Sequence, residues 1–293
     1  RRAESDAPLA ALGATPVRAD LSDVAALTRA LAGCEAVFHA AADTSLWRPG
    51  AAAQTATNVQ GTENLLRAAQ AARVGALVHT PSVSAFSHLV TGVLDETVAQ
   101  RGGESWINYE RSKYLGEQAV RGSGLPWIVF NPAHVLGPGD RHSWARLIRL
   151  IDQEKLPGIP PGSGDFADVR EIARAQVRAW QRGRFGQAYV MGGQRESYVD
   201  FVHRVGTALG RRTPRGATPA WALMTVARLA DAWSRVTGRE PNVTPEAATL
   251  TSQVRRVDSA KARRELDYRE TPLDGLLADT LAWMRSDGLI GRR

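Results

Sequence analysis

Short apolar runs alternate with longer amphipathic stretches along the first two thirds of the chain. Five apolar runs have the length of β-strands: 15–19, 35–39, 76–80, 127–130 and 188–191. Helical periodicity or helix-capping residues mark the stretches between them: 22–31, 52–72, the segment around Tyr109, and 169–181. Strands that alternate with helices indicate a parallel sheet covered on both faces. We therefore expect an α/β fold with a doubly wound parallel sheet.

The pattern changes near residue 136 and becomes mainly helical. A Pro/Gly-rich stretch covers 157–164, and further helices are expected at 143–153, 198–209 and 219–236. We expect residues 1–135 and 166–194 to form the larger domain that contains the sheet. Residues 136–165 and 195–293 then form a smaller, mostly helical domain over a cleft. The 219–236 helix is amphipathic, and we interpret it as a packing helix in preference to a membrane anchor.

Composition narrows the class of protein. The chain has 293 residues, 43% of them hydrophobic, and a formal charge of +7 that comes almost entirely from arginine. No Lys/Arg block with interleaved aromatic residues appears, so a nucleic-acid partner is not expected. Cys34 is the only cysteine, which excludes an internal disulfide, and the six histidines show no metal-binding pattern. No apolar run of about 18 residues occurs. The expectation is a cytoplasmic protein without a membrane partner.

The segment from Tyr109 to Lys113 carries the clearest chemistry. On a helix, residues four apart share one face, with Cβ atoms about 5–6 Å apart. A free tyrosine has a pKa near ~10, and a neighbouring ammonium lowers it, so the pair can act as a general acid or base. Ser105 is placed to cap this helix. Ser82 follows an apolar strand and can orient a substrate oxygen.

Other polar positions follow the predicted strands. Asp20, the run His39-Ala40-Ala41, Ser82 and Asn131 all fall at or just beyond strand ends. Ligands of open parallel sheets bind outside the carboxyl ends of the strands. These positions therefore predict one binding site along a single edge of the sheet.

Taken in order, these motifs resemble the extended branch of the short-chain dehydrogenase/reductase superfamily, in its dihydroflavonol-reductase-like and nucleotide-sugar-epimerase-like group. The resemblance covers nearly the whole chain. Its motifs are Asp20-Leu21 after a strand, the run 37–41, Asn58 to Thr62, Ser82, Tyr109 with Lys113, Asn131-Pro132 before the Gly-Pro-Gly of 137–139, and the closing segment 258–268. The fold that this resemblance implies is of the Rossmann type, with the larger domain binding a dinucleotide.

The resemblance also implies roles for individual residues. Ser82, Tyr109 and Lys113 would form the catalytic triad, with Ser84 a rival for Ser82. The residues that it places at the cofactor are Asp20, Leu21, His39, Ala40, Ala41, Asn58, Thr80, Tyr109, Lys113, Asn131 and Pro132. Trp47, Ser84 and His134 are the candidates for contact with substrate. Hydride transfer itself belongs to the cofactor.

The chain departs from the family pattern at its start. No Gly-x-x-Gly-x-x-Gly loop precedes Asp20. Our hypothesis is that an N-terminal strand, phosphate loop, helix and strand, roughly 30–40 residues, are missing from this sequence. Arg1 or Arg2 would then follow the second strand and could hold a 2′-phosphate. This favours NADP as the cofactor, with NAD the alternative.

Three functions follow. The first is an NAD(P)-dependent oxidoreductase that reduces a carbonyl, or oxidises a secondary alcohol, with a Ser-Tyr-Lys triad. The second is a nucleotide-sugar epimerase, and the third is a cofactor-sensing protein without turnover. The partner is a small-molecule substrate, and a homodimer formed through the two long helices is a further expectation from the resemblance.

Overall fold

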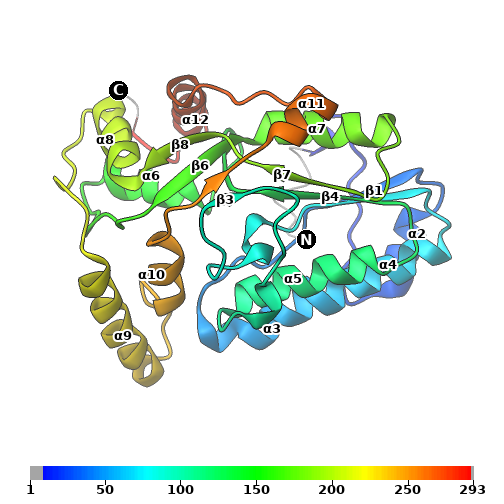
Figure 1. Ribbon diagram of the computed structural model, residues 1–293, viewed down its shortest axis with the longest axis horizontal. Helices are drawn as coiled ribbons and strands as arrows, with labels where there is room; N and C mark the ends of the chain where they lie inside the picture. The colour runs from blue at the N-terminus through cyan, green and yellow to red at the C-terminus, as the bar shows by residue number, and fades with distance from the viewer. Residues whose placement is uncertain (1–8, 292–293) are drawn as a thin grey trace.

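A four-stranded parallel sheet forms the centre of the computed structural model, which describes residues 9–291 (Figure 1). Its strands are β1 (Ala36–His39), β2 (Ala76–His79), β4 (Trp127–Pro132) and β7 (Gln187–Met191), in the order β1-β2-β4-β7. All four residues of β2 are buried. Such continuous apolar burial is typical of a strand covered on both faces. The predicted α/β fold with a parallel sheet is confirmed.

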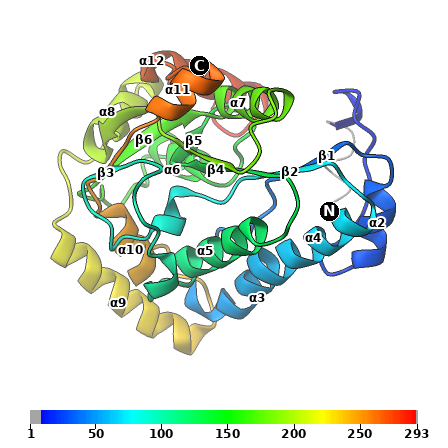
Figure 2. The same cartoon turned by 45° about the vertical axis from the view of Figure 1, so that its right-hand side comes forward.

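Helices cover both faces of this sheet (Figures 1 and 2). One face carries α2 (Val24–Leu31), α3 (Ala51–Thr55), α4 (Gly61–Ala71) and α5 (Asn108–Arg121), and the other carries α7 (Val169–Gln181) and α11 (Ala260–Leu266). A single π-helical turn, Ala56–Gln60, joins α3 to α4 without a break. On the first face the buried side chains of Leu65 and Leu66 belong to the same cluster as Leu77 and Val129 of the sheet.

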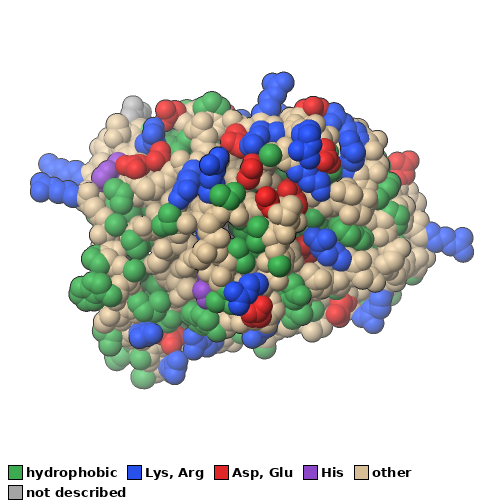
Figure 3. Space-filling view, viewed as in Figure 1, with side chains coloured by type: hydrophobic (Ala, Val, Ile, Leu, Met, Phe, Trp, Pro, Cys, Tyr) green, Lys and Arg blue, Asp and Glu red, His purple; other side chains and the backbone are tan. Residues whose placement is uncertain are grey.

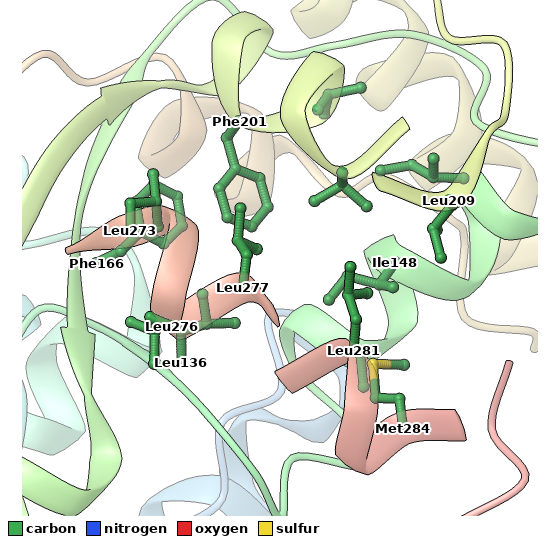
Figure 4. Close-up of a cluster of buried hydrophobic side chains, with 14 of the residues drawn as sticks. Leu136, Ile148, Phe166, Phe201, Leu209, Leu273, Leu276, Leu277, Leu281 and Met284 are labelled. Carbon is green, nitrogen blue, oxygen red and sulfur yellow. The ribbon is translucent and has the colours of Figure 1, made fainter. Parts of the chain in front are cut away.

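A second layer of structure lies beyond the carboxyl end of β4. It contains a three-stranded sheet of β5 (His134–Leu136), β6 (Ser163–Asp168) and β8 (Gln194–Ser197), in which β6 pairs parallel to β5 and antiparallel to β8. The helices α6 (Trp144–Asp152), α8 (Tyr198–Leu209) and α12 (Leu273–Ser286) pack here. Figure 4 shows the apolar cluster that they share with Leu136 and Phe166. The sequence indicated the helices but not this small sheet.

The remaining elements connect the two parts. Two short strands, β3 (Val93–Leu94) and β9 (Arg256–Val257), form a parallel pair of their own. Helix α9 (Ala220–Thr237) packs against α10 (Pro245–Thr251) at one corner of the molecule (Figures 1 and 2). Short 3-10 turns lie at Arg48–Gly50, Val83–Phe86 and Gly102–Glu104.

Two local predictions near the start of the described chain are wrong. Residues 15–19 form no strand, because β1 pairs only with β2 among residues 9–291 and offers them no hydrogen-bonded neighbour. Helix α2 is capped by Asp23 and not by Ser22, since the Asp23 carboxylate accepts a hydrogen bond from the Ala26 N–H at 2.9 Å. Ser22 instead donates to Asp20, which holds the turn before the helix.

Candidate active site

Helix α5 carries Tyr109 and Lys113 on one face, one turn apart. The Lys113 Nζ lies 5.7 Å from the centre of the Tyr109 ring. Tyr109 is half-buried, and only 6% of Lys113 is exposed. The predicted juxtaposition of a phenol and an ammonium is therefore present in the structure.

Two serines from the segment after β2 complete this group. Ser82 caps the short helix Val83–Phe86, because its Oγ accepts a hydrogen bond from the Ser84 N–H at 3.1 Å. The side chains of Ser82 and Ser84 both lie close enough to the hydroxyl of Tyr109 to lower its pKa. The structure thus brings both candidate serines to the tyrosine.

The pKa of Tyr109 departs from the expected direction. Burial raises it, and the buried carboxylate of Glu110 raises it further, while the hydrogen bonds from Ser82 and Ser84 act in the opposite sense. Burial is the largest of these effects. In the protein without ligand the phenol is therefore held in its protonated form, and the prediction of a lowered pKa is wrong for that state.

Lys113 is a buried cation without a hydrogen-bond partner among the residues that the structure describes. Burial lowers its pKa to about 8, and the Asp43 carboxylate nearby partly opposes that shift. Leaving an ammonium unsatisfied in a buried place is unfavourable. The three N–H donors of Lys113 are therefore available to a ligand oxygen.

Two buried asparagines hold the loops around this lysine. The Asn58 Oδ1 accepts from the Asp43 N–H at 2.8 Å, and its Nδ2 donates to Ser112 Oγ at 3.0 Å. Asn131 Nδ2 donates to the Ser82 carbonyl at 3.1 Å and to Glu117 at 2.7 Å. The resemblance placed Asn58 at the cofactor, but the oxygen and the nitrogen of its side chain both bond within the protein.

Asn131 differs from Asn58 in one respect. Its Oδ1 is buried and has no hydrogen-bond partner within residues 9–291. It comes from the end of β4, where Pro132 is also buried. A free acceptor on Asn131 and free donors on Lys113 are what a ligand with hydroxyl groups would use.

The end of β1 supplies the small residues expected there. Ala40 and Ala41 follow β1 and are exposed. Behind them, the His39 ring stacks on His79 with centroids 5.0 Å apart, and His39 Nε2 bonds to Thr62 Oγ1 at 2.9 Å. Burial lowers the pKa of His39 to about 4, so it is neutral. His39 is therefore a buried, neutral residue that supports the carboxyl end of β1 from the interior of the protein.

Thr80 and the Asp20 turn have partners inside the protein. Thr80 Oγ1 accepts from Gln176 Nε2 at 2.9 Å. The Asp20 carboxylate accepts from the backbone N–H of Ser22 at 2.8 Å and from its hydroxyl at 2.6 Å, and these bonds lower its pKa. The carbonyl of Leu21 accepts from Asn64 at 2.8 Å. Arg1 and Arg2, the remaining cofactor candidates, lie outside the described residues.

The two aromatic substrate candidates have different surroundings. Trp47 is half-buried, and its indole N–H has no partner among residues 9–291. His134 instead belongs to an aromatic cluster of the smaller part, with its Nε2 3.0 Å from the Tyr198 hydroxyl and its ring 5.1 Å from that of Trp144. No contact in the described part of the chain joins His134 to Tyr109.

We did not predict from the sequence that the carboxylate of Glu110 is buried. It links segments around the site through hydrogen bonds. Glu110 accepts hydrogen bonds from Ser87 Oγ at 2.7 Å, Ser105 Oγ at 2.6 Å and the His88 backbone N–H at 2.7 Å. Ser105 therefore does not cap α5, whose N-cap is Ile107. Glu110 adjoins Tyr109 in the chain, but nothing in the sequence indicated that it would be buried.

Two classes of site are not found in the described part of the chain. No group of three or more His, Cys, Asp or Glu side chains within residues 9–291 could hold a metal ion. Among the helices of the same residues, none combines the length and apolar character needed to cross a membrane.

The chain as a whole is similar to proteins that are already known. A solved structure, the crystal structure of gox2253, superposes with a TM-score of 0.81 at 30% identity, covering 97% of this chain and 88% of that one. The putative dihydroflavonol 4-reductase of Synechocystis sp. is 29% identical over 92% of this chain and 82% of its own length. The sterol demethylase protein B of Methylococcus capsulatus is 30% identical over 99% of this chain and 90% of its own length.

The sequence profile of the NAD dependent epimerase/dehydratase family matches residues 1–192, more than half of the chain. These relationships do not support the alternative of a sensing protein without turnover. The chain belongs to this family, within the extended short-chain dehydrogenases/reductases, and is an NAD(P)-dependent oxidoreductase.

Proposed function

We propose that this protein reduces a ketone on a bulky, largely apolar molecule to the secondary alcohol, or catalyses the reverse reaction, with NADP(H). The observation that carries the proposal is the group formed by Tyr109, Lys113 and two serines. The side chains of Ser82 and Ser84 act on the phenol of Tyr109, and the ammonium of Lys113 lies 5.7 Å from the centre of its ring. This is an arrangement for protonating and deprotonating an oxygen atom.

The residues around Tyr109 suit the nicotinamide and ribose end of a dinucleotide. Lys113 has free donors and Asn131 Oδ1 is a free acceptor, so together they could hold ribose and carboxamide groups. Ala40 and Ala41 are exposed and small, which lets a ligand approach the backbone at the carboxyl end of β1. When bound, the cofactor supplies or accepts the hydride. The preference for NADP over NAD rests on Arg1 and Arg2 and is part of the proposal.

The residues of the protein supply the proton that the reaction needs. In the direction of reduction, Ser82 and Ser84 bind the ketone oxygen and Tyr109 donates its hydroxyl proton to that oxygen. The raised pKa of Tyr109 keeps it protonated for this step. The ammonium of Lys113 then stabilises the phenolate that is left behind, and the proton is recovered from solvent. We propose these roles for Ser82, Tyr109 and Lys113 as the catalytic triad.

The substrate class follows from the surroundings of Tyr109 and from the relatives. The names of two relatives refer to a dihydroflavonol and to a sterol, which are both polycyclic. Trp106 precedes Tyr109 by three residues in the chain, and the Arg48 guanidinium lies 5.7 Å from the centre of the Trp106 ring. A flat apolar substrate suits such a lining better than a small polar one.

A nucleotide-sugar epimerase is the second candidate, because one cation near the site could hold a diphosphate. Arg255 is half-buried and donates to the carbonyl of Ser87 at 2.7 Å, just after the turn that carries Ser84. Burial lowers the pKa of Arg255, while Glu110 raises it. Binding of a nucleotide-sugar without net turnover of cofactor would favour this function over ketone reduction.

The domain division and the oligomer are also proposals. We assign residues 1–135 and 166–194 to the dinucleotide-binding domain and residues 136–165 and 195–293 to the substrate domain. A homodimer through the helices α4 and α5 remains a proposal that the mass of the protein in solution would test.

The test of the main proposal is oxidation of NADPH by the intact protein with a panel of polycyclic and aliphatic ketones. We expect Tyr109→Phe to lower kcat by about 10²- to 10⁴-fold, because the acid that protonates the oxygen is gone. The control is Tyr114→Phe, one turn further along α5, which should leave kcat within about twofold of the wild-type value. Equal turnover by the wild type and Tyr109→Phe would refute the role of the tyrosine.

A further inference from the structure

Helix α9 packs on the rest of the protein with its smaller side chains, and Leu223 and Met224 on the same side are half-buried. Its buried residues are Ala227, Asp231 and Ser234, and they lie on one face of the helix, toward α10. The Asp231 carboxylate accepts from Arg235 at 2.8 Å, and the Ser234 hydroxyl donates to the Asp231 carbonyl. The helix therefore buries one narrow side of mixed character and leaves its largest apolar side chains in solvent.

Its apolar side points away from the protein. The large side chains on this side are strongly exposed: Trp221 75%, Val226 57%, Leu229 67%, Trp233 69% and Val236 79%. At about 100° per residue these five fall within an arc of roughly 140°. Figure 3 shows apolar side chains gathered over the corner where α9 lies. The sequence indicated a packing helix, and the structure shows that its apolar face is the one left unpacked.

Within α9 itself, the charged side chains that are exposed to solvent are all positive. Its only acidic residue, Asp231, is 8% exposed and paired with Arg235. Arg228 is exposed and has no ion pair within residues 9–291, and just past the end of the helix Arg239 and its neighbour Glu240 are both exposed. An apolar face with aromatic residues and arginines at its margin has the composition of a helix that lies in a membrane interface.

We propose that the exposed face of α9, defined by Trp221, Val226, Leu229, Trp233 and Val236, docks on the surface of an anionic lipid bilayer. The arginines would pair with lipid phosphates while the tryptophans occupy the headgroup level. The protein does not cross the bilayer in this arrangement; the helix lies along its plane.

A second copy of the chain fits this face less well. A helix of 18 residues is about 27 Å long, so the contact between two copies through this face would be confined to one helix on each side. A two-fold antiparallel pairing about the middle of α9 would also bring Arg228 close to Arg228 of the other copy. Lipid phosphate complements this charge, whereas a second copy repeats it.

A chain of contacts connects α9 to the segment that precedes Tyr109. Helix α10, against which α9 packs, holds Glu246, and Arg48 Nε donates to Glu246 at 2.9 Å. Arg48 in turn packs over Trp106, which precedes Tyr109. A substrate dissolved in the bilayer would thus leave it close to the site.

The test is flotation of the intact protein with vesicles. One set contains phosphatidylcholine alone and the other a two-to-one mixture of phosphatidylcholine and phosphatidylglycerol. We expect the wild type to float with the mixed vesicles and to be released as salt rises. Leu229→Ser with Trp233→Ser should lower the partition coefficient at least about tenfold, and Arg228→Gln with Arg239→Gln should lower it on mixed vesicles only.

The matched control replaces two apolar residues exposed elsewhere, Val177→Ser with Phe185→Ser (each 42% exposed), and should float like the wild type. Because all these side chains are exposed, the melting temperatures of the variants should stay close to the wild-type value. Failure of the wild type to float, or equal flotation of the Leu229/Trp233 variant, would overturn the proposal. A dimer that the Leu229/Trp233 variant dissociates, with no flotation of the wild type, would assign the face to self-association instead.

Discussion

The buried charge of Lys113 is available to a ligand, but it destabilises the protein when no ligand is bound. Its ammonium is 6% exposed and has a pKa of about 8, against the usual 10.5. Below pH 8 both the folded and the unfolded chain carry the charge, so burial of the charge destabilises the fold in full. Between about 8 and 10.5 the unfolded chain binds more protons than the folded one, and stability rises with pH.

The first prediction at this scale concerns Lys113→Met, which keeps the length of the side chain and removes the charge. Without cofactor, the variant should be more stable than the wild type by up to about 3 kcal/mol at pH 7. The gap should shrink as pH rises toward 10.5, since the wild-type lysine becomes neutral in the fold. Melting curves of both proteins at pH 7 and pH 10 measure this, and a gap that stays constant would contradict it.

The sequence predicted the reactive pair but not what surrounds it. Tyr109 and Lys113 were found because helical spacing is local, and Ser82 because it follows an apolar strand. The buried positions of Glu110 and Asn131 depend on partners far away in the sequence, such as Ser87 and Glu117. The pKa of Tyr109 was mispredicted for the same reason, since burial is a property of the whole fold.

At the scale of elements, a glycine sets the distance between two helices next to the site. A Cβ added to Gly116 of α5 would lie 2.6 Å from the Asn58 carbonyl oxygen in the π-helical turn before α4. A backbone oxygen cannot move aside without moving its helix. The close approach lets Asn58 bond to Ser112 on α5, which keeps α5 in register with the loop that holds Asp43.

The corresponding prediction is that Gly116→Ala destabilises the protein by about 1–3 kcal/mol through overpacking. It should also lower activity, because α5 carries both Tyr109 and Lys113. The control is Gly275→Ala on α12, where an added Cβ meets nothing within 4 Å. That change should raise stability by about 0.5–1 kcal/mol. Chemical denaturation of both variants measures these changes. A similar loss of stability at both glycines would rule out the steric explanation.

Helices were easier to predict than strands at this scale. The boundaries of α7 and α8 agree with the apolar periodicity of the sequence. The strand predicted at 15–19 does not form, and β6 and β8 were not predicted. A strand exists only with a neighbour, and the polar residues of β6 and β8 gave no alternating pattern that would have indicated one.

At the scale of the whole molecule, the binding of a cofactor should appear as a gain in stability. A ligand present at 100 times its dissociation constant adds about 2.7 kcal/mol, which for a chain of this size is a rise in melting temperature of roughly 4 °C. We expect this rise with NADPH and a smaller one with NADH at equal concentration. Lys113→Met should lose most of it.

The outcome of that experiment separates two questions. A rise with NADH alone would refute the proposed preference for NADP but leave the oxidoreductase intact. A rise of equal size in Lys113→Met would show that the lysine does not contact the bound cofactor. Either result is independent of which substrate the enzyme reduces.

The pairing of β3 with β9 also has a consequence for how the protein is made. Leu94 lies in the first half of the chain, and its partner Val257 is near the end. At a synthesis rate of about 5–20 residues per second, roughly ten seconds or more separate the appearance of the two strands on the ribosome. Until β9 emerges, the segment after Ser82–Ser87 has neither this strand partner nor Arg255, which donates to the Ser87 carbonyl. The loop next to the site is therefore expected to be among the last parts of the protein to become ordered during synthesis.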